Sequence, residues 1–191
     1  MTHVALIRGI NLGPNKRVSM AALKAACERL GFTDVRTLLN SGNVVFSTKL
    51  SPKAAAAKIE RALEHELKVP ARVLVLTADE IEEAVAKNSL TKVGTNHSRL
   101  FAAFLWEPVP ALDALRKQDW GLQRIAVTPR AAYLWCPDGF ESTLVKAFHK
   151  AVGTGVTVRN WATVLKLHAM TRADGPPPKK KAPAKGRTRA K

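Results

Sequence analysis

Two polar segments that contain glycine, residues 8–17 and residues 40–43, carry the side chains of this sequence that are best suited to chemistry. Each adjoins a strongly apolar segment, and loops in such positions commonly carry functional groups. Guanidinium, amine and amide groups, together with glycine N–H groups, are typical ligands of phosphate and carboxylate. We therefore expect an anion-binding site formed by Arg8, Asn11, Asn15, Lys16, Arg17, Ser41 and Asn43.

A second interpretation of the polar residues is structural. Asparagine and serine often form turns in which the side chain bonds its own backbone, and this applies to Asn11, Asn15, Ser41 and Asn43. The glycines Gly9 and Gly13 match neither a dinucleotide-binding fingerprint nor a phosphate-binding loop that ends in Gly-Lys-Ser/Thr. The sequence alone leaves both interpretations open.

A third segment of interest spans residues 157–164. Asn160 has the residue type of a helix N-cap, and Trp161 that of a core residue, which gives a structural explanation of the segment. The alternative is that Arg159 and the N-terminus of the following helix bind an anion, so Arg159 and Asn160 are further candidates. The sequence does not show whether this segment approaches the first two.

Standard catalytic and metal-binding patterns are absent from the sequence. The five histidines are scattered, with no metal-ligand spacing beside cysteine or acid, and no Gly-x-Ser-x-Gly nucleophile motif occurs. His97 lies in a polar loop and is the best catalytic candidate, although an exposed loop histidine is the simpler interpretation. We predict no metal and no cofactor, and the sequence does not decide whether the protein is an enzyme.

The order of predicted elements in residues 1–77 is strand, helix, strand, strand, helix, strand, which is typical of a split βαβ, ferredoxin-like unit. In such a unit the loop after the first strand and the turn of the hairpin lie at the same end of the sheet. The candidate residues of both segments should therefore converge. The predicted strands are residues 3–8, 35–39, 43–48 and 72–77, and the predicted helices are residues 20–30 and 52–68.

The second half repeats the order strand, helix, strand, strand, helix within residues 99–152. A capping box at Thr77 predicts a connecting helix to about residue 87, and a last helix is expected over residues 160–170. We therefore predict an α+β protein of two ferredoxin-like halves in residues 1–174, followed by a tail. The expected elements are strands 100–106, 123–128 and 131–136 and helices 110–117 and 142–152.

Charge is the strongest compositional feature, with a formal net charge of +16. The segment 175–191 is rich in lysine, alanine and proline, contains no acid, and is predicted to be disordered. Residues 1–174 hold 24 of the 31 basic residues against 15 acidic residues, a net charge of +9. Both parts should attract polyanions. The tail cations are Lys179, Lys180, Lys181, Lys185, Arg187, Arg189 and Lys191.

The remaining composition indicates a cytoplasmic protein. No apolar stretch approaches the roughly 20 residues of a membrane-spanning helix, and residues 4–7 are too short for a secretory signal core. The two cysteines, Cys27 and Cys136, are far apart, so buried reduced thiols are expected rather than a disulfide.

Three stretches give the chain a resemblance to the bacterial family of domain of unknown function 1697, over roughly residues 1–170. They are Arg8-Gly9-Ile10-Asn11, Ser41-Gly42-Asn43-Val44-Val45-Phe46 and Arg159-Asn160-Trp161-Ala162-Thr163-Val164. The resemblance implies an α+β fold of two ferredoxin-like halves, and it implies no reaction, cofactor or catalytic residue. Pro14 stands where relatives often have glycine, which removes one N–H donor from the loop. The tail is similar to the Lys-Ala-Pro tails of some bacterial DNA-binding proteins.

Two functions are consistent with these observations. The first is a binding module for DNA, RNA or another polyanion, largely non-specific and acting through the basic body and tail. The alternative is an enzyme or binder for a small phosphorylated or carboxylated ligand, held by the Arg8–Arg17 loop and the Asn40–Asn43 hairpin. No membrane partner is expected, and the sequence does not determine the oligomeric state.

Overall fold

The computed structural model describes residues 1–11 and 17–172. Two of the predicted ligands, Asn15 and Lys16, and the seven tail cations lie outside the described residues. The first half forms an antiparallel sheet with strand order β2-β3-β1-β4. Its elements are β1 (Thr2–Ile7), α1 (Met20–Arg29), β2 (Thr33–Leu38), β3 (Asn43–Ser47), α2 (Pro52–His65) and β4 (Val73–Thr77).

The second half forms a second antiparallel sheet with the equivalent order β6-β7-β5-β8. The helix α3 (Ala78–Ala86) connects the halves, and α6 (Trp161–Thr171) follows the last strand. The prediction of two ferredoxin-like halves is therefore confirmed. The remaining elements are β5 (Leu100–Leu105), α4 (Leu112–Arg116), β6 (Arg124–Val127), β7 (Ala131–Trp135), α5 (Thr143–Val152) and β8 (Val156–Asn160).

One strand was not predicted. The segment Val156–Asn160 forms β8 and pairs with β5 in the register Thr157 to Phe104. Its Val-Thr-Val run has β-branched side chains that favour a strand, but it is short and follows two glycines. Pairing with a strand more than fifty residues earlier determines the conformation, so the local sequence was a weak signal.

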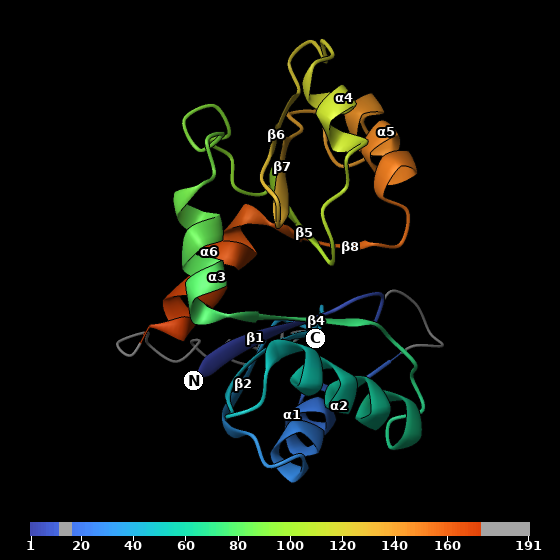
Figure 1. The fold of residues 1–191 in the computed structure, drawn as a ribbon, viewed down its shortest axis with the longest axis vertical. Coiled ribbons are helices and arrows are strands. Elements are labelled where there is room, and N and C mark those ends of the chain that lie inside the picture. The colour runs from blue at the N-terminus through green and yellow to red at the C-terminus, as the bar shows by residue number, and fades with distance from the viewer. Residues whose placement is uncertain (12–16, 173–191) are drawn as a thin grey trace, which may run out of the picture.

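The sheets and helices form layers, as Figure 1 shows. Helices α1 and α2 cover the outer face of the first sheet, and α4 and α5 cover the outer face of the second. The central core contains apolar side chains of both sheets, such as Val45 and Tyr133, and of α3 and α6, such as Ile81 and Trp161. Burial of these surfaces joins the halves into one body.

Polar side chains cap several of the helices at their first turns. The side chains of Ser19, Ser51, Ser142 and Asn160 accept hydrogen bonds from the first turns of their helices. Thr77 and Glu80 form the predicted capping box of α3. Among the described residues, no helix has the length and apolar character needed to cross a membrane.

The end of β1 lies beside the β2–β3 turn, as the topology predicted. Leu6 pairs with Asn43, and the Ile7 N–H donates to the Gly42 carbonyl at 2.8 Å. Gly42 has a φ of +75°, and a Cβ built there would lie 2.8 Å from Ile10 Cδ1 and 2.9 Å from Ile7 Cβ. The close approach of the loop and the hairpin therefore requires glycine at this position.

We expect Gly42→Ala to lower the free energy of unfolding by about 2–4 kcal/mol, because a positive φ and steric overlap both oppose the methyl group. Gly31→Ala is the matched control, since Gly31 has a φ of +83° with no atom within 4 Å of the built Cβ. The control should lose only about 1–2 kcal/mol. Urea denaturation measures both, and equal losses would contradict the steric argument.

Candidate functional site

The guanidinium group of Arg159 joins all three sequence segments that were singled out for chemistry. Arg159 lies on β8 of the second half, and its Nε donates to Asn43 Oδ1 at 2.5 Å. Its Nη2 donates to the carbonyl of Ile7 at 2.8 Å and to that of Ser41 at 3.2 Å. Its Nη1 donates to Thr157 Oγ1 and to the Val158 carbonyl. The third segment therefore does reach the first two.

Every N–H of this guanidinium has a protein acceptor. An arginine has five N–H donors, and the acceptors are four carbonyls, one amide oxygen and one hydroxyl. Burial lowers the pKa of Arg159 to about 10, so the group stays charged at neutral pH. Within the described chain no carboxylate pairs with it. Arg159 therefore links the two halves structurally, and its guanidinium has no free N–H donor for an anion.

The amide and hydroxyl groups of the turns also bind the backbone. Asn11 Nδ2 donates to the carbonyls of Val18 and Asn40 at 3.0 and 2.7 Å, and Asn11 Oδ1 accepts from the Val18 N–H at 2.8 Å. Asn43 Nδ2 donates to the Leu38 carbonyl and to Ser41 Oγ. These contacts favour the interpretation of Asn11, Ser41 and Asn43 as turn residues. Asn160 Oδ1 accepts from Thr163 as the N-cap of α6.

Arg8 differs from these neighbours because it lines a cleft between the halves. The cleft has a volume of about 1510 Å³ and is lined by α2, by β4 and by the loop after β5. Arg8 Nη1 donates to the Thr154 carbonyl of the second half at 3.1 Å. Arg17 is exposed and does not line this cleft. Of the predicted ligands in the described residues, Arg8 alone lines the cleft.

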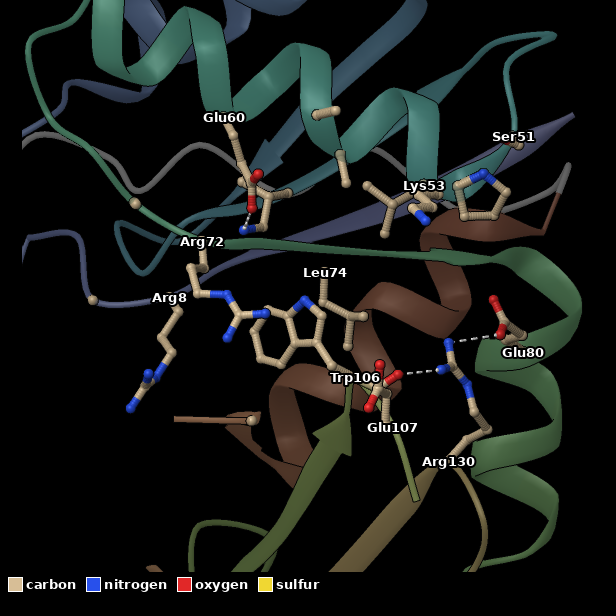
Figure 2. A pocket seen from close by; sticks show the side chains of 18 of the residues that line it. Arg8, Ser51, Lys53, Glu60, Arg72, Leu74, Glu80, Trp106, Glu107 and Arg130 are labelled. Carbon is tan, nitrogen blue, oxygen red and sulfur yellow. Dashed lines mark hydrogen bonds and ion pairs between the residues drawn. The ribbon is translucent and has the colours of Figure 1, made fainter. Parts of the chain in front are cut away.

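Arg72 and Trp106 also line the cleft, and sequence reasoning missed both. The Arg72 guanidinium lies 4.6 Å from the Trp106 ring centroid, a cation–π contact between the halves. The Arg8 N–H donates to the Arg72 carbonyl at 2.9 Å, so the two arginines are neighbours across β1 and β4. Figure 2 shows Arg72 beside the Trp106 ring, with Arg8 close by. No motif in the sequence marks these residues, because the contact joins two halves.

The cleft as a whole is not uniformly basic. Among the described residues, four basic and four acidic side chains line it, and the Arg130–Glu80 ion pair at 3.1 Å neutralises one of each. Glu60 Oε1 accepts from the Val73 N–H at 2.8 Å on the free edge of β4. Within the described chain, neither Arg8 nor Arg72 forms an ion pair. These two arginines are therefore the cations of the cleft best placed to bind a ligand.

The histidines give no second candidate. His65, His97 and His149 are exposed, and His3 is buried with Nδ1 beside the Met1 carbonyl. Burial, and to a smaller extent the charge of Arg8, lowers the pKa of His149. Where side chains are described, no cluster of three or more His, Cys, Asp or Glu could hold a metal ion.

The fold and its cleft define an α+β protein of two linked ferredoxin-like halves. The family model described as protein of unknown function DUF1697 matches residues 1–133, and the chain belongs to this family. The solved structure of the conserved bacterial protein SP0830 from Streptococcus pneumoniae is similar, with a TM-score of 0.74 and 19% sequence identity. The match covers 90% of this chain and 98% of that chain, and it shows the fold alone. No curated protein matches significantly.

We expect Arg159→Lys to lower the free energy of unfolding by about 2–4 kcal/mol. An ammonium group has three donors where the guanidinium has five, so partly buried acceptors lose their partners at roughly 1–3 kcal/mol each. Arg29→Lys is the control, since Arg29 forms an exposed ion pair with Glu66 and should change stability by less than about 1 kcal/mol. Chemical denaturation measures the free energy of unfolding of both variants. An equal loss in both would show that the hydrogen bonds of Arg159 do not stabilise the fold more than an exposed ion pair does.

Proposed function

We propose that this protein binds a small phosphorylated or carboxylated ligand in the cleft between its two halves. The observation that carries the proposal is the pair formed by Arg8 and Arg72 beside Trp106. A guanidinium group offers parallel N–H donors that match the oxygens of a phosphate or a carboxylate. Stacking on Trp106 limits the motion of Arg72, so less side-chain entropy is lost when a ligand binds.

The charge distribution of the cleft favours a small ligand there over a polyanion. Glu64 and Glu107 line the same cleft and form no ion pair within the described residues. A nucleic acid strand laid along the cleft would bring phosphates close to these carboxylates, and like charges repel. A ligand with a single anionic group brings far fewer negative charges near these carboxylates than a nucleic acid strand would.

The test is a thermal-shift and calorimetry comparison with pyrophosphate, AMP and citrate as probes. At least one probe should stabilise the unmodified protein. Arg8→Gln and Arg72→Gln should each weaken its binding about 10-fold to 100-fold, since one charged hydrogen-bonding group is worth roughly 1.5–3 kcal/mol. Arg29→Gln, on the outer face of the first half, is the control and should bind as the unmodified chain does. Binding that is equally strong in all variants, or no binding of any probe, contradicts the proposal.

A second candidate function, non-specific binding of DNA or RNA, is favoured by the net charge of +16. The seven cations of residues 175–191 would contact phosphates and release counterions, which makes affinity fall steeply with salt. This function does not need the cleft, so the two proposals are independent.

The measurement is the salt dependence of binding to duplex DNA, for the full chain with and without its tail charges. Replacing the seven tail cations by glutamine should weaken binding and lower the slope of log affinity against log salt by up to about 6, or roughly 0.9 for each lost phosphate contact. An unchanged affinity and slope would show that the tail makes no phosphate contacts. The thermal unfolding of both proteins should coincide, which controls for folding.

A further inference from the structure

We propose that the ligand of the cleft joins its anionic group to a planar ring, as a nucleoside monophosphate does. This inference rests on the function proposed above, and it names the class of small anion that the cleft binds. The observation that carries it is the juxtaposition of two unlike groups in the cleft, the two arginines of the first half and the half-buried indole of Trp106 in the second.

Trp106 occupies the position in the second half that Arg8 occupies in the first. The Arg8 N–H donates to the Arg72 carbonyl at 2.9 Å, which continues the pairing of β1 with β4. The Trp106 N–H donates to the Gly155 carbonyl at 3.2 Å, which continues the pairing of β5 with β8 in the same way. All four residues line the cleft. The cleft therefore lies where two equivalent corners meet, the first formed by Arg8 and Arg72 and the second by Trp106 and Gly155.

The two corners differ in chemistry. The first presents two guanidinium groups, and the second presents an indole ring and a glycine, which has no side chain. Glu107, which follows Trp106 and also lines the cleft, would repel an anion held at the second corner. Because Arg8 and Arg72 form no ion pair within the described chain, the anionic group belongs at the first corner. The uncharged part of the ligand then faces the second corner.

The wall at the second corner suits a flat apolar group. Trp106 and Val109 are half-buried and Pro108 is exposed, and all three line the cleft. Figure 2 shows the Trp106 ring among the lining side chains, and the Arg72 guanidinium lies 4.6 Å from its centroid. Both groups are planar, and both stack on aromatic rings. A ring attached to the anion can stack beside them, whereas an inorganic anion would leave this apolar surface in water.

The experiment compares AMP with ribose 5-phosphate by calorimetry on the full chain. Both probes carry a phosphate at the same position of ribose, and only AMP has a ring system that can stack. AMP should bind about 10-fold more tightly, which is the typical effect of one base stacking on an aromatic side chain. In NMR spectra the indole N–H signal of Trp106 should shift when AMP is added, and much less when ribose 5-phosphate is added.

Trp106→Leu should remove most of the difference in affinity between the two probes. A weaker restraint on Arg72 in this variant would affect both probes alike, so the ratio of the two affinities reports on stacking. Trp120→Leu is the matched control, because Trp120 is half-buried in the second half and does not line the cleft, and it should keep the difference. The affinity ratio and the NMR shifts of the unmodified protein test the proposal even if Trp106→Leu does not fold.

Two outcomes would overturn the proposal of a planar ring. One is AMP binding no more tightly than ribose 5-phosphate, and the other is a difference that persists in folded Trp106→Leu. If ribose 5-phosphate, pyrophosphate or citrate then still binds through Arg8 and Arg72, the anion site stands without the ring. If none of the probes binds the unmodified chain, both proposals fall.

Discussion

The hydrogen bonds of one partly buried cation, Arg159, hold together the parts of this protein on which its arrangement depends. The guanidinium reaches from β8 of the second half to the end of β1 and to the β2–β3 turn of the first. Because charged donors left without partners are costly away from water, all five N–H groups are satisfied only when the three segments meet in this geometry. The close packing of Gly42 against Ile7 and Ile10 gives the same junction a steric constraint.

The cleft is a consequence of this junction. Fixing the halves at Arg159 leaves a space between α2 and β4 on one side and the loop after β5 on the other. Two further contacts cross the space, Arg8 to the Thr154 carbonyl and Arg130 to Glu80. Arg72 and Trp106 come from different halves, so their contact exists only while the halves keep this orientation. The proposed anion site therefore depends on the structural link, although Arg159 itself has no donor left for a ligand.

The sequence predicted most of the fold because the fold follows local rules. The capping box at Thr77 and the cap residue Asn160 located the starts of α3 and α6. The order of elements then predicted two ferredoxin-like halves and the meeting of the first loop with the hairpin turn. Strand β8 was missed, because its conformation depends on pairing with the distant β5. A short Val-Thr-Val run after two glycines does not carry that information.

The candidate site was predicted only in part, and the reason is physical. Residue types identify groups that can bind an anion, and so they identified Arg8, but they do not show whether a donor is already used. Tertiary contacts use the donors of Asn11, Asn43 and Arg159 within the protein. They also bring Arg72 of the first half onto Trp106 of the second. The sequence by itself determined the elements, their order and the basic charge, because these depend on neighbours along the chain. Only the tertiary structure decided which charged groups face a cavity, because hydrogen bonds and stacking between the halves join residues far apart in the chain.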